Sequence, residues 1–398
     1  MARLLQSGAL HSFGPNPGGR LEAGWKVLLV GDYPPPHGGV AVHVDELQQA
    51  IRAAGGEAVV LDIGKGQLPT EGVIPAGSPA QFLLQLALHI ACGFLVHVHT
   101  GGANRKSWML ASLCAAAGRA SGRPAVLSLH SGLGPAWLAE SQFRRAVAAR
   151  VGGAFGAVVA VSHPIARTLR ICGVPAARIS VMPAFSRALL APGPPPPRLE
   201  EIRREGEPVL CAMLAPGKVY GAEVLLRAFA RLRAAAPRAQ LVLYGAGTAD
   251  ASLRALARQL CGASAEAVHG LGELARPAAL GVISQSDLFV RPTLADGDSV
   301  SVREALALGR RVVATAVGTR PAGVLLVPPG DDLQLARALR EALAAPGPAE
   351  GRREGASAGV EPFARLFDIY RGAIDRGADV PASAPPVPEG QCAASAGS

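Results

Sequence analysis

Aromatic residues and cysteines are scarce in this sequence of 398 residues. Phenylalanine, tryptophan and tyrosine make up only 4% of the chain, which argues against the basic and aromatic surfaces that bind nucleic acid by stacking. The six cysteines are scattered, with no C-x-x-C pair and no histidine-rich stretch beside them. This spacing argues against a zinc site and a disulfide framework, and it favours reduced thiols in a cytosolic protein.

The sequence also lacks a long uninterrupted apolar run. The most apolar segment, residues 82–98, contains Gln85, His89 and Gly93, so it predicts a buried helix followed by a strand rather than a membrane span. Residues 1–24 have no continuous apolar core, which argues against a signal peptide and predicts a loose leader. The net charge of +9 suits an acidic partner, such as a phosphorylated ligand or an anionic membrane surface.

The length of the chain favours two domains of ordinary size. A proline run at residues 192–197 marks a linker between them. The predicted order is a loose leader (1–24), a first domain (25–186), a linker (187–207), a second domain (208–343), a further linker with a C-terminal helix (344–376) and a disordered tail (377–398).

The most informative stretch lies between two short apolar runs, residues 287–291 and 311–317, which each predict a buried strand. A glycine-bearing loop and a short helix, which Gly309 can end, connect them. In a doubly wound sheet such a loop opens into the ligand crevice, where the positive helix end suits a phosphate. Asp296 lies on the loop and Glu304 one turn into the helix, so one acid can address each end of such a ligand.

Asp296-Gly297, followed by the helix Glu304-Ala-Leu-Ala-Leu-Gly309, resembles the donor-site signature of the family 4 retaining glycosyltransferases. The resemblance implies an α/β fold of the GT-B type, in which two Rossmann-like, doubly wound domains face each other across a cleft. It also implies that the C-terminal helix crosses back to the first domain. The family usually has glutamate at the first acid, where this chain has the shorter Asp296.

The residues alone leave two other interpretations of this stretch open. Ser301-Val-Arg-Glu304 fits a capping box, in which the glutamate only reaches back to the start of the helix. Asp296-Gly-Asp298 imitates the Asp-x-Asp metal motif of the other glycosyltransferase fold. A hard cation needs more oxygen ligands than this loop offers, so we expect no metal. The resemblance implies no cofactor either, because the nucleotide-diphospho-sugar is a substrate.

Other segments resemble the same family in chain order. Gly38 and Gly39 match a Gly-Gly loop that faces the donor phosphates, and His130 matches a histidine that contacts the transferred sugar. Lys218 matches a lysine that binds the donor diphosphate, but Met213 stands where the family has an arginine for that group. The substitution removes a bidentate phosphate clamp, so either another basic residue binds the diphosphate or activity is reduced.

The resemblance therefore implies a set of site residues. Asp296 and His130 would bind the hydroxyls of the sugar, and Lys218 would stabilise the negative charge of the departing diphosphate. Glu304 would accept hydrogen bonds from the ribose hydroxyls. The donor would also contact Gly38, Gly39, Gly245, Gly247, Gly297, Asp298, Ser299 and Val300.

The expected function is transfer of a sugar from a nucleotide-diphospho-sugar to a hydroxyl of a glycan or a polyprenyl-linked saccharide, in bacterial surface or exopolysaccharide assembly. A cytoplasmic protein that is peripheral on the inner face of the membrane would reach such an acceptor. Arg144, Arg145 and Arg150 favour an anionic membrane surface, and the alternative is that they form a solvated basic face.

Three other functions compete with this one. A GT-B sugar-nucleotide epimerase is the nearest enzyme, whereas a phosphorylase would need a pyridoxal-phosphate lysine for which the sequence gives no context. Met213 and Asp296 also fit a catalytically silent nucleotide-sugar-binding protein, because both depart from the family pattern.

Overall fold

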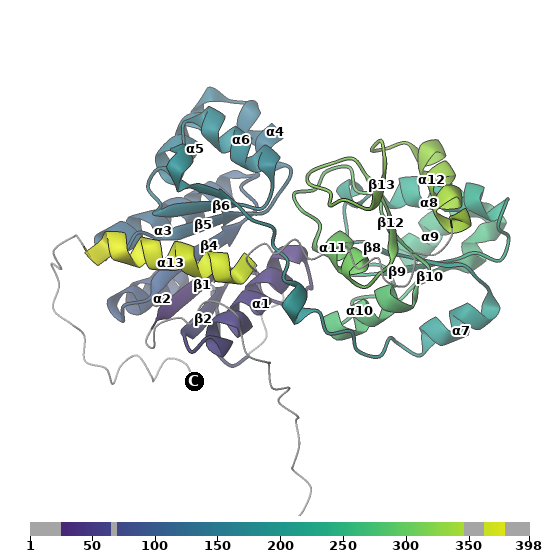
Figure 1. Cartoon of the computed structure of the whole chain (residues 1–398), viewed down its shortest axis with the longest axis horizontal. Helices are drawn as coiled ribbons and strands as arrows, with labels where there is room; N and C mark the ends of the chain where they lie inside the picture. Colours follow the sequence, from purple (N-terminus) through teal and green to yellow (C-terminus); the bar gives the residue numbers. More distant parts are fainter. Residues whose placement is uncertain (1–24, 65–69, 346–361, 379–398) are drawn as a thin grey trace, which may run out of the picture.

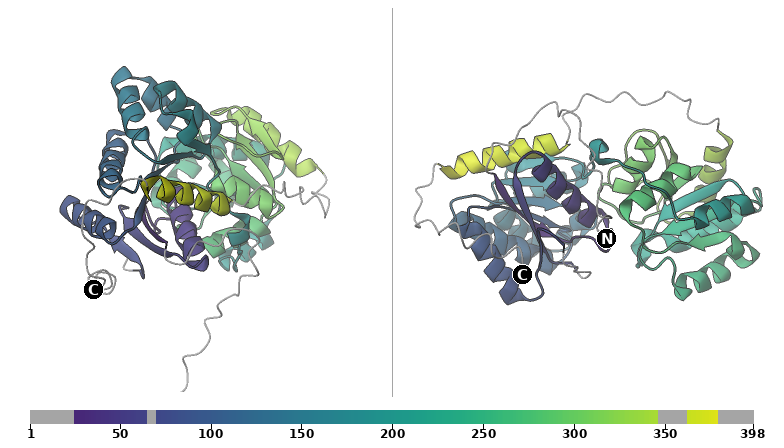
Figure 2. Two further views of the ribbon diagram at one scale, coloured as in Figure 1. Left: turned by 60° about the vertical axis from the view of Figure 1, so that its left-hand side comes forward. Right: turned by 90° about the horizontal axis from the view of Figure 1, so that it is seen from below.

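The computed structural model describes residues 25–64, 70–345 and 362–378. Within these ranges the chain forms two α/β domains, each built on one sheet of parallel strands (Figure 1). Figure 2 shows the two domains from two further directions, with the C-terminal helix α13 (Pro362–Ala378) lying across the first of them. The predicted class, two doubly wound α/β domains, is confirmed.

The sheet of the first domain has seven strands in the order β3-β2-β1-β4-β5-β6-β7. Alternate residues of its strands enter two different cores: Leu28 and Val30 of β1 pack on one face, and Val27 and Leu29 on the other. The strands are β1 (Lys26–Gly31), β2 (Glu57–Asp62), β3 (Val73–Pro75), β4 (Leu95–Thr100), β5 (Val126–Leu129), β6 (Ala157–Ala160) and β7 (Ile179–Val181).

Helices cover both faces of this sheet. On one face lie α2, α3, α5 and α6, and on the other lie α1 and α13. The last helix is fixed there by its buried apolar side and by Tyr370, whose hydroxyl lies 2.6 Å from Nδ1 of His97 in β4. The helices of the first domain are α1 (Gly39–Ala53), α2 (Pro79–Ala91), α3 (Arg105–Ala120), α4 (Gly134–Ala139), α5 (Gln142–Gly152) and α6 (His163–Cys172), with 3-10 turns η1 (Ala176–Arg178) and η2 (Arg187–Leu189).

The sheet of the second domain has six strands in the order β10-β9-β8-β11-β12-β13. Helices α8, α9 and α12 cover one face, and α7, α10 and α11 cover the other. The strands are β8 (Val209–Met213), β9 (Gln240–Tyr244), β10 (Val268–Gly270), β11 (Leu288–Arg291), β12 (Arg311–Thr315) and β13 (Val324–Val327). The helices are α7 (Arg198–Glu205), α8 (Ala222–Arg233), α9 (Ala251–Cys261), α10 (Arg276–Gln285), α11 (Val300–Ala307) and α12 (Asp332–Ala344), with 3-10 turns η3 (Lys218–Tyr220) and η4 (Gly262–Ala267).

Residues 82–98 form most of α2 and the start of β4, as the sequence predicts, but α2 is only half buried. Its Leu83, Leu84 and Leu88 are 40% exposed or more. Among the described residues, no helix combines the length and the apolar character that crossing a membrane requires.

Several expectations fall on residues that the structure does not describe. The predicted leader, residues 1–24, lies outside the described ranges, as do residues 346–361 of the second linker and residues 379–398 of the predicted tail. Cys92 is disulfide-bonded, so the expectation of reduced thiols is wrong for this residue. Free thiols are found at Cys114, Cys172, Cys211 and Cys261.

Candidate active site

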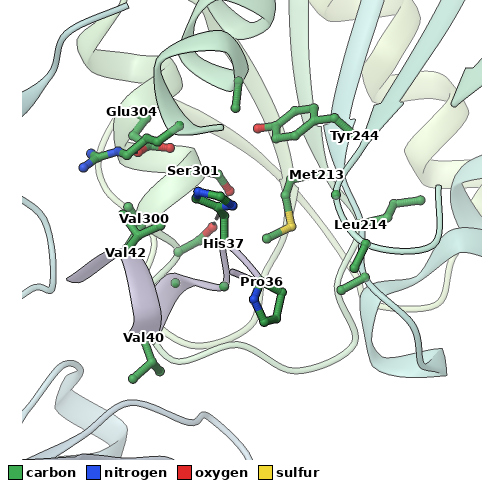
Figure 3. A pocket seen from close by; sticks show the side chains of 18 of the residues that line it. Pro36, His37, Val40, Val42, Met213, Leu214, Tyr244, Val300, Ser301 and Glu304 are labelled. Atoms are coloured by element: carbon green, nitrogen blue, oxygen red, sulfur yellow. Dashed lines mark hydrogen bonds and ion pairs between the residues drawn. The ribbon is translucent and has the colours of Figure 1, made fainter. Parts of the chain in front are cut away.

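A cavity of about 400 Å³ lies between the domains, where the carboxyl ends of strands from both sheets meet. This is the place at which doubly wound α/β sheets bind ligands, and the volume suits a small molecule. The first domain contributes the loop after β1 and the start of α1, and the second contributes the ends of β8, β9 and β11 and the start of α11. Figure 3 shows Pro36, His37, Val40 and Val42 of the first domain, and Met213, Leu214, Tyr244, Val300, Ser301 and Glu304 of the second.

Two glycines let the domains approach closely beside this cavity. A Cβ atom added to Gly132, in the loop after β5, would overlap the carbonyl group of Asp296. A Cβ atom added to Gly297 would overlap the carbonyl group of His130. The structure therefore places Gly297 at the domain contact and not in the cavity wall, although the sequence predicts it as a donor-binding residue.

The N-terminus of α11 faces the cavity. Ser299 caps the helix, because its hydroxyl accepts a hydrogen bond from the backbone N–H of Val302. Ser299, Val300 and Ser301 all line the cavity, so the first N–H groups of the helix, which have no partner within it, lie at the cavity wall, where an anion could accept their hydrogen bonds. The capping-box interpretation of Ser301 and Glu304 is wrong, because Ser299 is the cap and Glu304 pairs with Arg276 instead.

Glu304 belongs to an ion-pair chain that joins the two domains. Arg276, the first residue of α10, pairs with Glu304 (Nη2 to Oε1, 3.0 Å) and with Glu46 of α1 in the first domain. All three side chains are at most 16% exposed. Burial raises the pKa of Glu304, although the Arg276 guanidinium opposes this shift. One cation is thus shared by two carboxylates at this end of the cavity.

Asp296 has the opposite arrangement, with one carboxylate between two arginines. Its Oδ2 atom accepts hydrogen bonds from Nε of Arg291 (3.1 Å) and from Nη2 of Arg320 (3.2 Å), and its Oδ1 accepts one from the backbone N–H of Gly297 (3.1 Å). Burial alone would raise the pKa of Asp296, but the two arginines outweigh it and lower the pKa below its ordinary value. Two cations therefore share one carboxylate here.

Asp298 is paired with Arg303 of α11, the helix that follows it. Nε of Arg303 lies 2.8 and 2.9 Å from the two carboxylate oxygens of Asp298. Burial raises the pKa of Asp298, and Arg303 opposes the shift. Both carboxylates of the Asp296-Gly-Asp298 segment are therefore neutralised by arginines rather than directed together at one point, as a shared metal ion would require.

His130, which follows β5 and lines the cavity, is packed against two other histidines. Nε2 of His130 lies 3.2 Å from Nδ1 of His99 in β4, and the ring of His43 in α1 packs at a tilt against both rings. Burial lowers the pKa of His43 to about 4 and those of His99 and His130 well below their ordinary values, so all three are neutral imidazoles near neutral pH. In the described part of the chain, this is the one group of three histidine, cysteine or acidic side chains close enough to hold a metal ion.

Two predicted residues lie beside the cavity rather than in its wall. Lys218 is exposed, and with Gly247 it lines a neighbouring hollow that shares the wall formed by residues 214–216 and Ala246 with the cavity. The predicted residues that do line the cavity are Gly38, Gly39, His130, Gly245, Asp296, Asp298, Ser299, Val300 and Glu304.

Sequence reasoning did not identify several charged residues that line the cavity or pair with its walls: Glu46, Glu273, Arg276, Arg291 and Arg320. A signal existed for Arg291 alone, because an arginine at the end of an otherwise apolar strand lies on the ligand edge of the sheet. The others depend on pairings between segments that are distant in the chain.

Two family models match the chain. Residues 37–185 match the model described as Glycosyltransferase Family 4, and residues 208–345 match the model described as Glycosyl transferases group 1. None of the curated proteins matches this chain in sequence.

Several solved structures have a similar fold. HepE from Anabaena in complex with UDP-glucose is 18% identical, with a TM-score of 0.62 over 88% of this chain and 93% of that one. A sucrose-phosphate synthase from Thermosynechococcus elongatus is 20% identical, with a TM-score of 0.62 over 89% and 94% of the two chains. The α,α-trehalose 6-phosphate synthase of Burkholderia multivorans is 15% identical, with a TM-score of 0.57 over 89% and 95%. The similarity confirms the predicted GT-B fold.

Proposed function

The chain belongs to the group 1 glycosyltransferases of family 4, and we propose that it transfers a sugar from a nucleotide-diphospho-sugar to an acceptor hydroxyl with retention of configuration. One observation carries the proposal: a single cavity combines the open N-terminus of α11, the Asp296–arginine group and the buried carboxylate of Glu304. The similar fold of HepE, which was solved with UDP-glucose, supports a donor of this class.

In the proposed reaction the difficult event is departure of a diphosphate from the anomeric carbon. The N–H groups at the start of α11 would stabilise the charge that develops on the diphosphate, because they are fixed before the reaction begins. Neutral His130 and the carboxylate of Asp296 would hold sugar hydroxyls, His130 being oriented by its contact with His99. A phosphate oxygen would accept the proton of the acceptor hydroxyl, so no protein nucleophile is required.

The first test is a thermal-shift screen with UDP, GDP, ADP and their common sugar conjugates. A ligand that binds only the folded protein stabilises it by about 2.7 kcal/mol at a concentration of one hundred times Kd, so one nucleotide family should raise Tm. The shift should be equal with and without EDTA, because the helix end and the arginines supply the positive charge. No shift with any of these ligands would contradict the proposed donor, and a shift that EDTA removes would contradict metal-independent binding and direct attention to His43, His99 and His130.

We propose further that the acceptor is a glycan or polyprenyl-linked saccharide presented at an anionic membrane surface, which α5 of the first domain would touch. Phe143 at its start is 76% exposed, and Arg150 near its end is exposed as well. Arg144 is less available, because it pairs with Glu140 and stacks over Trp137 at 4.4 Å from the ring centre. An aromatic side chain beside arginines fits an interfacial contact with acidic lipid.

The double variant Phe143→Ser/Arg150→Gln should bind anionic vesicles about tenfold more weakly than the wild type, since one arginine near such a surface contributes about 1 kcal/mol and the loss of Phe143 removes apolar contact with the lipid. Vesicle sedimentation at low and high salt measures the binding, which should weaken with salt. The matched control is Leu326→Ser/Arg340→Gln, which changes an exposed leucine and an exposed arginine of the second domain. Equal binding by both double variants would contradict the proposed surface.

A further inference from the structure

The charges around the cavity are unevenly distributed. At one end a single cation, Arg276, lies between the carboxylates of Glu46 and Glu304, which leaves one negative charge in excess. At the other end the carboxylate of Asp296 lies between Arg291 and Arg320, which leaves one positive charge in excess. Arg276, Glu304, Arg291 and Asp296 all line the same cavity, so its two ends differ in sign.

Of the two arginines at the positive end, Arg291 is the one turned toward a ligand. Arg320 is only 3% exposed, and it donates hydrogen bonds to Asp296, to the hydroxyl of Thr293 (3.2 Å) and to the carbonyl of Thr315 (3.0 Å). Arg291 lines the cavity and uses its Nε on Asp296, but its Nη1 makes only long contacts, 3.5 and 3.6 Å, with the carbonyl and sulfur of Met213. The terminal nitrogens of Arg291 are therefore poorly satisfied within the described residues.

The position of Arg291 follows from the register of the sheet. Parallel strands β8 and β11 pair Leu210 with Leu288 and Cys211 with Phe289, so their last residues, Met213 and Arg291, are neighbours at the carboxyl edge. Figure 3 shows the uncharged side chain of Met213 among those that line the cavity. The positive charge at this edge therefore comes from β11, the same strand whose following loop leads into the N-terminus of α11.

From this arrangement we propose that Arg291 is the residue that binds the diphosphate of the donor, together with the first turn of α11. An arginine whose terminal N–H groups make only long contacts, on a buried wall, is suited to bidentate contact with phosphate oxygens. The inference rests on the proposed function, and it fixes the direction of the donor in the cavity. The diphosphate lies between Arg291 and α11, and the nucleoside extends toward Arg276 and Glu304.

The test compares nucleoside diphosphates with nucleosides. Calorimetric titration with UDP, GDP and ADP first finds the diphosphate that the wild-type protein binds, and the matching nucleoside is titrated alongside it. In Arg291→Met the affinity for the diphosphate should fall about 10- to 100-fold, as expected for a hydrogen bond to a charged group. The affinity for the nucleoside should change by less than about twofold, because the nucleoside lacks the group that Arg291 binds.

A second substitution tests whether a positive charge on the neighbouring strand can replace that of Arg291. Met213→Arg in the Arg291→Met background places a guanidinium one strand away on the same edge, and it should restore most of the lost affinity for the diphosphate. Arg291→Gln keeps a hydrogen-bond donor for Asp296 but removes the charge, so it replaces Arg291→Met in the test if that variant does not fold. It should likewise lose affinity for the diphosphate but not for the nucleoside.

The possible failures are distinguishable. If the wild-type protein binds none of the three diphosphates, the proposed function fails before Arg291 is tested. If the wild type binds one of them and Arg291→Met and Arg291→Gln bind it equally well, the role of Arg291 is overturned while the proposed function stands. An equal loss of affinity for diphosphate and nucleoside also overturns the proposal, because it shows that Arg291 only maintains the shape of the cavity.

Discussion

Asp296→Asn should lower kcat about 100- to 1000-fold, the usual cost of removing one preorganised contact to the transition state, without weakening nucleotide binding. The carboxylate of Asp296 holds Arg291 and Arg320 on one oxygen, and the proposed mechanism also gives it the sugar hydroxyls. The neutral amide leaves both arginine charges uncompensated, so a diphosphate should bind as tightly as before or more tightly. A transfer assay measures kcat, and calorimetric titration with the nucleoside diphosphate measures Kd.

Asp298→Asn is the matched control for this experiment. Asp298 lies two residues away on the same loop, but both of its oxygens are occupied by Arg303 of the helix that follows, so its replacement should lower kcat less than about tenfold. Parallel losses of kcat and of nucleotide affinity in Asp296→Asn would show that Asp296 only supports the loop. A wild-type protein that binds the nucleotide without any turnover would instead be the catalytically silent binding protein, the alternative that Met213 favours.

Local sequence was sufficient for the parts of the site that depend on one strand, loop or helix. The apolar run that ends at Arg291 and the glycine-bearing loop after it predicted a strand followed by a helix N-terminus at a ligand edge, and the structure has both. The alternative capping-box interpretation placed the cap two residues too late, because Ser299 and Ser301 are equally good capping residues by type. Only the backbone direction at residue 299, which is extended, decides that Ser299 caps the helix.

Contacts between the domains could not be read from the sequence. Glu46 and Arg276 are separated by 230 positions, and neither lies in a motif that indicates a partner. The same is true of Gly132. Only the contact between the loops of the two domains shows that no side chain fits at this position. Sequence reasoning could therefore expect a ligand at Glu304 but could not identify its ion pair with Arg276.

Replacing Arg276 with methionine should lower the free energy of unfolding by about 3–5 kcal/mol at pH 8, because it leaves two buried carboxylates without their shared cation. The side chains of Glu46 and Glu304 are only 3% and 10% exposed, so water replaces little of the interaction with the guanidinium. Urea unfolding at several pH values measures the loss. Arg231→Met, which breaks the more exposed ion pair with Asp332, should cost less than about 1 kcal/mol.

The loss caused by Arg276→Met should shrink as the pH falls. The pKa of Glu304 is already raised by burial in the intact protein, and removing the Arg276 cation raises it further. A carboxyl group whose pKa is higher in the folded than in the unfolded state contributes its full stability below the unfolded pKa, and this is lost as the pH rises through the folded pKa. Arg276→Met/Glu46→Gln/Glu304→Gln, which has no charge to bury, should therefore recover most of the stability at pH 8. A loss that is the same at every pH, or that persists in the triple variant, would mean that Arg276 joins the domains through packing rather than through charge.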